Sequence, residues 1–375
     1  MNTCSGMPHG IFSGGRGTHG NGDLMKVALF YGGQDIRVEE LPDPKPGPGE
    51  ALVRVRAAGV CGSDLHNYRG HRTASAGVPW QQGHELAGEV AALGEGVSGL
   101  IIGQRVAVEA EHLLGCGRCS WCKDGQNHLC PERGMRDGER HSSHGFSQFD
   151  VCVAKNLHPI SNSVSFGAAA LVDCYACGVH AMNRSPVPPG GTAAIIGAGA
   201  IAMTLGQVLK ANGVAQVVMI GTRKQPLDVA LSCGAADKTV CVADTDAVQA
   251  VVDITNGEGA AVTYETVGGQ SQLIAQAIAM TQRGGSISVL GLFTVPQQLD
   301  ATVCMQKELS LKWSNSFSTW NGESEYRIAL GLLESGKLQP EPVITHEYPI
   351  EEINAAFVDA DNKASSGAIR VMVIP

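Results

Sequence analysis

The sequence lacks three features that would each assign it to a large class of proteins. No apolar run approaches the roughly 20 residues that a membrane span requires. Acidic residues outnumber basic ones, which gives a net charge of -9, and no Lys/Arg run or series of interleaved aromatic residues reverses this balance. Residues 1–24 have no apolar core like that of a secretory signal. We therefore expect a cytoplasmic protein with neither a membrane nor a nucleic-acid partner.

The composition is that of a globular protein. The 375 residues are 43% hydrophobic and 17% charged, so the chain is long enough to form two hydrophobic cores. Residues 1–24 are rich in Gly, Ser and Thr without a usable period, and we expect a flexible tail there. Many of the 12 cysteines stand singly in apolar surroundings, which is typical of buried thiols in a reducing compartment.

The pattern of the chain changes twice. From Lys26 to about Ile160, short β-like runs alternate with Pro and Gly clusters, which favours a β-rich, barrel-like unit. After "SPVPPGG", strand and helix patterns alternate, and "SQLIAQAIAMTQRGG" is one of the predicted helices. This alternation predicts a parallel sheet with helices on both faces. From Ser318 the pattern is mixed again and closes with a predicted strand, "AIRVMVIP".

Four cysteines lie close together in "GCGRCSWCKDGQNHLC". The C-x2-C-x2-C-x7-C spacing of Cys116, Cys119, Cys122 and Cys130 lets four thiolates surround one ion at about 2.3 Å. Four soft ligands without an open position are typical of structural zinc, which would stabilise a segment with few large hydrophobic residues. Disulfides or a C-x-x-C redox pair are the alternatives, and the short gaps leave little room for unstrained disulfides.

A second set of metal-ligating residues comes from three separate motifs, "GVCGSDLH", "GHE" and "LVDCYACGVH". Cys61, His84 and Asp173 would offer one sulfur, one nitrogen and one oxygen, and would leave a fourth position for water or substrate, as in catalytic zinc sites. Each residue also has an ordinary explanation: a core thiol, a satisfied imidazole, and a helix cap or ion pair. Spacing alone leaves these explanations open.

The stretch "IIGAGAIA" follows a predicted strand and opens a predicted helix, the context that a dinucleotide-binding loop requires. Gly197 would allow the tight turn, Gly199 would let the backbone approach the pyrophosphate, and Ala202 would keep the helix close to the sheet. The pyrophosphate would lie at the helix N-terminus, formed by Ala200 and Ile201, where free N–H groups point outward.

The next predicted strand, "QVVMI", ends without the carboxylate that would bind the ribose of NAD. It is followed by Gly221, Thr222 and Arg223, which offer space, a hydroxyl and a guanidinium to a 2′-phosphate. We therefore expect NADP, although a solvated basic turn would leave NAD equally possible. Residues at the ends of later strands are expected to line the nicotinamide pocket: Gly268, Leu290, Gly291 and Leu292.

The motifs, taken in order, resemble those of the zinc-dependent medium-chain alcohol dehydrogenases, in particular the branch that acts on polyols, secondary alcohols and threonine. The resemblance covers Lys26 to Pro375. It implies an α/β protein in which a GroES-like β-rich catalytic domain is joined to a Rossmann domain with a doubly wound parallel sheet. The implied catalytic domain comprises residues 25–176 and 318–375, with a structural zinc lobe at about 112–134, and the implied nucleotide-binding domain comprises residues 177–317.

The resemblance also implies roles for single residues. Cys61, His84 and Asp173 would hold the catalytic zinc, and Glu85 would lie behind the metal or enter its shell transiently. Ser63 would accept the alcohol proton and His66 would pass it to solvent. Asp64 would orient a ligand histidine. Helix capping is the alternative for Ser63 and Asp64, and a merely exposed histidine is the alternative for His66.

The implied activity is hydride transfer between NAD(P) and a secondary alcohol of the polyol, cyclitol or amino-cyclitol type. The family would have two zinc ions per chain and would assemble as a homodimer or homotetramer through an edge strand around "SISVLG". A zinc-free quinone or enoyl reductase and a non-catalytic zinc and nucleotide binder are the alternatives. The chain departs from the family pattern at Gln104, Ala202, His141 and His144.

Overall fold

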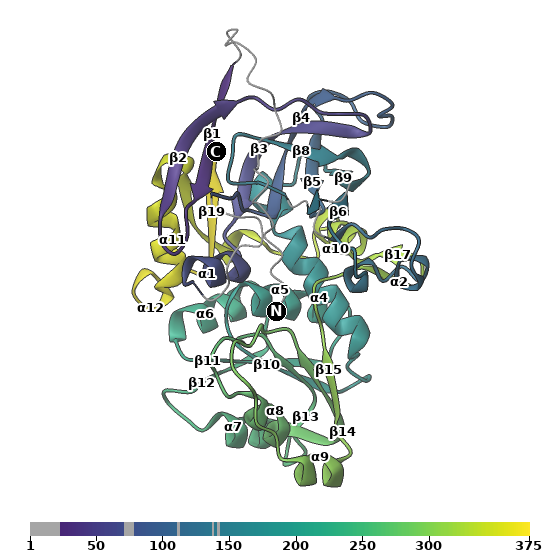
Figure 1. The fold of residues 1–375 in the computed structure, drawn as a ribbon. Helices are drawn as coiled ribbons and strands as arrows, with labels where there is room; N and C mark the ends of the chain where they lie inside the picture. The colour runs from purple at the N-terminus through teal and green to yellow at the C-terminus, as the bar shows by residue number, and fades with distance from the viewer. Residues whose placement is uncertain (1–22, 71–78, 111–112, 137–138, 141–142) are drawn as a thin grey trace, which may run out of the picture.

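The computed structural model describes residues 23–70, 79–110, 113–136, 139–140 and 143–375. Two β-sheets occupy opposite ends of an elongated molecule, with helix α4 (Val172–Arg184) between them (Figure 1). Residues 1–22 of the expected tail, and His141, lie outside the described residues.

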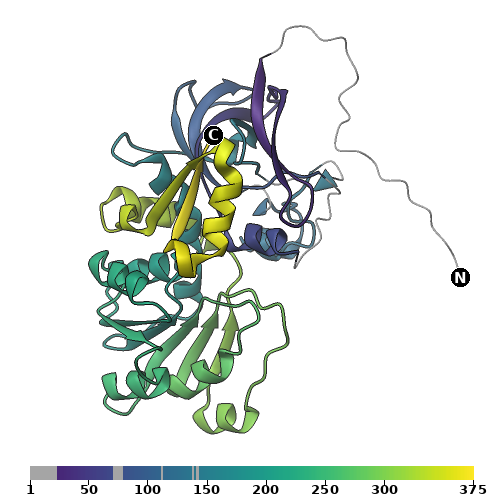
Figure 2. The same ribbon diagram turned by 90° about the vertical axis from the view of Figure 1, so that its left-hand side faces the viewer.

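The first sheet is mainly antiparallel and has the order β18-β19-β3-β4-β5-β9, with β8 also paired to β3. Its C-terminal strands join it through antiparallel pairing of β19 with β3, and Figure 2 shows them in yellow beside the earlier strands. The strands are β3 (Glu50–Gly59), β4 (Glu85–Leu93), β5 (Arg105–Val108), β8 (Phe149–Val153), β9 (Leu157–Pro159), β18 (Ile344–Pro349) and β19 (Arg370–Ile374).

The core of this end combines aromatic residues from distant parts of the chain. Phe30 lies in the hairpin of β1 (Leu24–Phe30) and β2 (Ile36–Pro42). Its ring centroid is 5.4 Å from that of Phe357 in α11 (Ile353–Asp361), and Phe146 lies 5.7 Å from Phe357. Such edge-to-face contacts add to the stabilisation that burial provides.

The second sheet is parallel throughout and has the order β12-β11-β10-β13-β14-β15, which is the doubly wound order of a Rossmann fold. Its inner strands are apolar runs because helices cover both faces. The strands are β10 (Thr192–Ile196), β11 (Gln216–Gly221), β12 (Lys238–Cys241), β13 (Ala260–Glu265), β14 (Thr281–Val289) and β15 (Ser310–Trp313). The helices are α5 (Ala200–Ala211), α6 (Lys224–Ser232), α7 (Ala247–Ile254), α8 (Ile274–Met280) and α9 (Ala301–Lys307).

Two details differ from the sequence-based expectations. The helix predicted over "SQLIAQAIAMTQRGG" ends at Met280, because the chain enters β14 at Thr281 through an irregular stretch in which Gly284 has φ +73°. The strand containing "SISVLG" is not at the edge of its sheet. β14 pairs with β15 on its outer side, so β15 is the edge strand.

Shorter elements connect the two sheets and form the lobe that contains Cys116 to Cys130. Among the described residues, no helix has both the length and the apolar composition needed to cross a bilayer. The remaining α-helices and strands are α1 (Gly62–Tyr68), α2 (Ser120–Lys123), α3 (Phe166–Ala170), α10 (Glu325–Glu334), α12 (Lys363–Ser366), β6 (Met135–Arg136), β7 (Glu139–Arg140), β16 (Thr319–Trp320) and β17 (Glu323–Ser324).

Helix α4 packs closely against α5 because Gly178 has no side chain at the contact: a Cβ atom there would lie 3.0 Å from the Cα atom of Leu205. On α5 itself, Gly206 packs against the chain that follows α6, where a Cβ atom would overlap the carbonyl oxygen of Ala235. Nearby, the Tyr175 hydroxyl donates to Gln207 Oε1 at 2.9 Å. The position of α4 therefore depends on this contact with the parallel sheet's first helix.

This packing predicts opposite effects for two helical glycines. Gly206→Ala should lower the free energy of unfolding by about 1–3 kcal/mol because the added methyl group collides with backbone. Gly331→Ala, on α10 where a Cβ atom meets nothing within 4 Å, should raise it by about 0.5–1 kcal/mol. Urea unfolding of both variants would check this. Equal effects of the two substitutions would contradict the packing argument.

Candidate active site and metal centres

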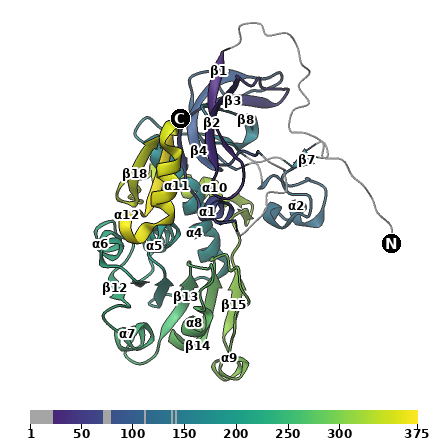
Figure 3. The same ribbon diagram turned by 60° about the vertical axis from the view of Figure 1, so that its left-hand side comes forward.

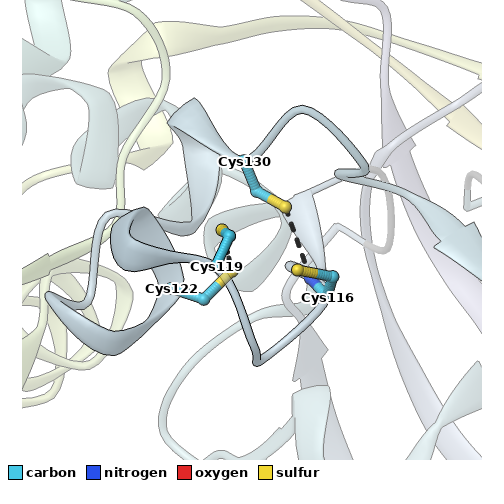
Figure 4. Close-up of side chains that lie close together, drawn as sticks. All are labelled: Cys116, Cys119, Cys122 and Cys130. Carbon is cyan, nitrogen blue, oxygen red and sulfur yellow. Dashed lines mark hydrogen bonds between the residues drawn. The ribbon is translucent and has the colours of Figure 1, made fainter.

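The four clustered cysteines face one another in the lobe (Figure 4). Their sulfur atoms all lie within 4.8 Å of one another, and the Cys119 and Cys122 sulfurs are 3.5 Å apart. Helix α2 begins directly after Cys119, so one helical turn carries two of the four thiols. All four are free thiols, as is every other cysteine in the described part of the chain. The arrangement suits one tetrahedral ion and not a pair of disulfides.

The thiols do not share one environment. Backbone N–H groups of Arg118 and Cys119 lower the pKa of Cys116 to about 6, whereas burial raises the pKa of Cys122 to about 12. Several sulfurs crowded without a cation repel one another as thiolates, and a bound divalent cation would remove this cost.

Ser318 connects the lobe to the rest of the molecule. Ser318 Oγ accepts the N–H of Asn127 at 2.9 Å and donates to the carbonyl of Gly125 at 2.5 Å. The N–H of Ser318 donates to the buried carboxylate of Glu325 at 2.8 Å, which lies 2.6 Å from His180 Nδ1 on α4. Burial opposes ionisation of Glu325, but these hydrogen bonds prevail and lower its pKa. The lobe is therefore fixed to α4.

A second cluster forms where β3 and β4 meet. Cys61 precedes α1, and His84 and Glu85 stand where β4 begins. The antiparallel register pairs Gly59 with Glu85, which brings the two segments together. The candidate ligand atoms of Cys61, His84 and Glu85 all lie within 4.8 Å of one another. Gly83 between them has φ +100°, a conformation that favours glycine.

Asp173 lies beside this cluster but outside the group that shares the 4.8 Å limit. It is in the first turn of α4, and its side chain is almost fully buried. Its Oδ2 atom is buried and has no hydrogen-bond partner. Burial raises the pKa of Asp173 to about 7, and nearby Glu85 adds to the rise, while His84 and Arg370 oppose it. An unpartnered buried carboxylate oxygen beside a thiol and an imidazole fits a cation site.

The charged groups around His84 also indicate a cation site. Burial disfavours the imidazolium, but the Cys61 thiolate, Asp64 and Asp173 together raise the pKa of His84 well above its usual value. Acidic groups thus surround His84, and the same groups would attract a divalent cation.

Residues of the predicted proton path lie on α1. Ser63 is partly exposed and His66 is buried. Asp64 Oδ2 accepts the N–H of Cys61 at 2.9 Å, so the capping alternative is realised for Asp64. Its other oxygen lies 4.0 Å from His84 Nδ1, which is near the imidazole but beyond hydrogen-bonding distance.

Arg370 was not among the residues predicted from the sequence. Its guanidinium pairs with Glu85 at 2.6 Å and donates to the carbonyl of Val60 at 2.8 Å and to the Cys174 sulfur at 2.7 Å. All of these groups are buried or next to the cluster. The one available signal was a single charged residue in the otherwise apolar "AIRVMVIP".

The glycine loop has the geometry of a phosphate-binding turn. Gly197 has φ +119°, and a Cβ atom there would overlap the Thr266 hydroxyl. Gly199 caps α5, and a Cβ atom there would enter open space. Ala202 is buried, as the close approach of helix and sheet requires. The free N–H groups at the start of α5, around Ala200, thus face space that a pyrophosphate could fill.

The turn after β11 contacts the opposite end of the chain. The Arg223 guanidinium donates to the carbonyl of Lys363 at the start of α12, and Figures 1 and 3 both place α12 next to α6. Gly221 is buried and Thr222 is exposed. One N–H of Arg223 is used in this contact, so the guanidinium keeps further donors for a phosphate.

Another residue that the sequence analysis missed organises the predicted nicotinamide loops. The fully buried Glu265 accepts the N–H groups of Val267 and Gly268 at 2.8 and 2.9 Å through its carboxylate. Its carbonyl accepts the N–H of Leu290 at 2.8 Å, and Gly291 also donates to it. The N–H of Gly269 donates to the carbonyl of Leu292 at 2.7 Å, so the two loops lie side by side.

Departures from the family pattern have local roles. Gln104 Oε1 accepts the N–H of Ile101 at 3.0 Å. His144 contacts Asp150, whose carboxylate accepts its backbone N–H at 2.9 Å and lies 3.5 Å from its ring.

The comparisons with known proteins agree with this geometry. Residues 47–162 match the alcohol dehydrogenase GroES-like domain, and residues 200–335 match the zinc-binding dehydrogenase family. A sorbitol dehydrogenase of Halalkalibacterium halodurans is 31% identical over 353 residues, which cover 93% of this chain and 98% of that protein. The chain belongs to the zinc-dependent medium-chain alcohol dehydrogenase family.

Two solved structures share the fold at 25% identity. A short chain alcohol dehydrogenase from E. coli CFT073 complexed with NADH has a TM-score of 0.83, with 94% of this chain and 100% of that chain covered. A zinc-binding dehydrogenase from Sinorhizobium meliloti 1021 bound to NADP has the same TM-score and coverage. The GroES-like and Rossmann architecture is thus confirmed. The zinc-free reductase and the non-catalytic binder are not favoured.

Because a side chain at position 199 would enter open space, a substitution of Gly199 should weaken nucleotide binding without destabilising the fold. Gly199→Val should weaken NADPH and NADH binding by roughly 100-fold or more, because the side chain blocks the loop's N–H donors, while the melting temperature stays close to that of the wild type. Fluorescence titration and thermal unfolding would measure both. Gly197→Val is the contrast and should also destabilise the fold. Normal nucleotide binding by Gly199→Val would show that the loop does not hold the pyrophosphate.

Proposed function

We propose that this alcohol dehydrogenase transfers a hydride between NADP and a secondary alcohol of the polyol or cyclitol type. The observation that carries the proposal is the convergence of Cys61, His84, Glu85 and the unpartnered carboxylate oxygen of Asp173 in one largely buried pocket. The sorbitol dehydrogenase relative supports a polyol as the substrate.

Cys61, His84 and Asp173 would hold the catalytic zinc, with Glu85 behind them. A zinc ion bound there would supply a Lewis acid that makes an alcohol hydroxyl more acidic. The ion pair with Arg370 holds Glu85 in place, so Asp173 is the carboxylate still free to bind a cation. Cys116, Cys119, Cys122 and Cys130 would hold the second, structural zinc.

Residues of α1 would move the alcohol proton. Ser63, partly exposed beside Cys61, would accept it, and His66, one turn further into the helix, would deliver it to solvent. Asp64 would hold the start of α1 and the His84 ring in fixed relative positions, because one of its oxygens accepts the N–H of Cys61 and the other lies near His84 Nδ1.

The nucleotide would bind across the C-terminal ends of the parallel strands. Its pyrophosphate would lie at Gly199, Ala200 and Ile201, its nicotinamide near Gly268 and Leu290–Leu292, and its 2′-phosphate at Thr222 and Arg223. A 2′-phosphate is supported by the guanidinium's spare donors and by the lack of a carboxylate at this turn. The NADH-bound relative supports NAD as the alternative cofactor.

The wider arrangement follows from the same family. We propose a catalytic domain of residues 25–176 and 318–375, a nucleotide-binding domain of residues 177–317, and a cytoplasmic homodimer or homotetramer. The free thiols of the described residues support a reducing compartment.

A substrate screen tests the activity. Polyols, cyclitols and secondary alcohols would be assayed with NADP and NAD in parallel, and zinc would be counted by elemental analysis. We expect two zinc ions per chain in the wild type. Cys61→Ala should abolish turnover and leave one zinc ion, with nucleotide binding nearly intact because Cys61 lies outside the nucleotide loop. Loss of nucleotide binding in Cys61→Ala would show that the site is wrongly placed.

Cofactor choice has its own test. Arg223→Ala should weaken NADPH binding by roughly 10- to 100-fold, because a charge-assisted contact to the 2′-phosphate is lost. It should change NADH binding far less. Lys224→Ala is the matched control, since Lys224 pairs with Asp244 at the surface. Equal weakening of both nucleotides by Arg223→Ala would contradict the assignment.

A further inference from the structure

Two amide side chains next to the metal pocket form a pair that the fold itself does not explain. Asn67 Nδ2 donates to Gln82 Oε1 at 2.6 Å. Gln82 is only 6% exposed, and its Nε2 group is buried without a hydrogen-bond partner. An unsatisfied buried donor is costly, so most such groups in native proteins have a partner. The missing acceptor for Gln82 Nε2 therefore points to a ligand.

Asn67 lies on the open face of α1. Cys61, Ser63 and Asn67 are partly exposed, whereas Leu65 and Tyr68 are buried in the core. Ser63 and Asn67 are four residues apart and so lie on the same side of the helix, about 5–6 Å apart along its axis. The amide of Asn67 is thus one helical turn from the hydroxyl proposed to accept the alcohol proton.

Gln82 is tied to the metal pocket through the main chain. It precedes His84 by two residues, and the intervening Gly83 turns the chain. The carbonyl of Gln82 accepts the N–H of Phe146 at 3.2 Å, and the carbonyl of Gly83 accepts the N–H of Gly145 at 2.7 Å. These bonds fix the segment, so the amide has a defined place relative to His84.

We propose that the Asn67–Gln82 amide pair binds a second hydroxyl of the substrate and so selects diols and polyols over alcohols with a single hydroxyl. This inference rests on the proposed function and specifies which feature of the substrate the same site recognises. Gln82 Nε2 would donate to the second hydroxyl oxygen, and that hydroxyl could in turn donate to Asn67 Oδ1.

The chemistry of the pair favours hydroxyl groups over charged groups. Both amides are neutral, so they do not compensate the ammonium and carboxylate of an amino-acid substrate. The spacing of one helical turn suits a hydroxyl a few carbon atoms from the reacting carbon. A substrate that lacks this hydroxyl leaves Gln82 Nε2 buried and unpaired, which is the situation in which polar sites discriminate most strongly.

The test compares matched substrates on the zinc- and nucleotide-loaded enzyme. A diol or polyol that the screen finds active is paired with its analogue in which the neighbouring hydroxyl is replaced by hydrogen, and 2,3-butanediol with 2-butanol is the simplest pair. The wild type should prefer the diol in kcat/KM by roughly 10-fold or more. Gln82→Leu should lower kcat/KM for the diol by roughly 10- to 100-fold and lower that for the mono-alcohol much less. Calorimetric binding of the diol to the enzyme with reduced nucleotide bound should weaken in parallel.

Matched controls separate this role from a structural one. Gln81→Leu changes the adjacent, partly exposed glutamine and should leave the diol preference intact. Asn67→Ala removes the other half of the pair at a partly exposed position and should reduce the preference in the same direction, which keeps the test available if Gln82→Leu does not fold.

The possible outcomes are distinct. An equal loss for both substrates in Gln82→Leu and Asn67→Ala, or a wild type that prefers the mono-alcohol, would overturn the inference while leaving the proposed function in place. Absence of turnover with every alcohol and ketone of the screen, with either nucleotide, would instead refute the proposed function itself.

Discussion

The buried guanidinium of Arg370 is the group on which the geometry of the metal pocket depends. It contacts Glu85 on β4, the carbonyl of Val60 before α1, and Cys174 on α4. These three segments carry His84, Cys61 and Asp173 respectively. A buried cation is tolerated only when its partners remain in place, so each segment is held by the cost of leaving a charge unpaired. A small ion can therefore be bound by residues that are far apart in the sequence.

Helix α4 connects the metal pocket both to the parallel sheet and to the cysteine lobe. Its first turn carries Asp173, its middle packs against α5 through Gly178, and its later turns carry His180, which contacts Glu325. The lobe with four cysteines is attached to Glu325 through Ser318. The cysteine lobe is thus connected to the metal pocket through α4, so a metal ion bound in the lobe would stabilise the surroundings of the pocket at a distance.

Local features of the sequence predicted much of this arrangement. The cysteine spacing, the glycine loop between strand and helix, and the alternation after residue 191 are short-range patterns, and each predicted the correct local structure. The interactions of Arg370 and Glu265 could not be predicted in this way, because their partners come from strands that pair only in the folded chain. The amide of Gln82 was also missed, since an unpaired donor is visible only when its surroundings are known.

The edge position expected for "SISVLG" failed for a related reason. Strand order in a parallel sheet is set by crossovers, and the short "SLKW" segment of β15 adds one more strand beyond β14. Glu85 and Asp173 show the same limit. The family resemblance predicted different roles for the two carboxylates, but the ion pair between Glu85 and Arg370 could not be predicted from it.

The pairing of β19 with β3 also has a consequence for the order of folding. The guanidinium that assembles the pocket is 310 positions later in the chain than the Val60 carbonyl it binds. The parallel sheet lies between them and is built from consecutive segments, so it can form while the ribosome is still producing the strand that carries Arg370. Until that strand is synthesised, the segments that carry Cys61 and His84 lack the buried guanidinium that joins them in the complete fold.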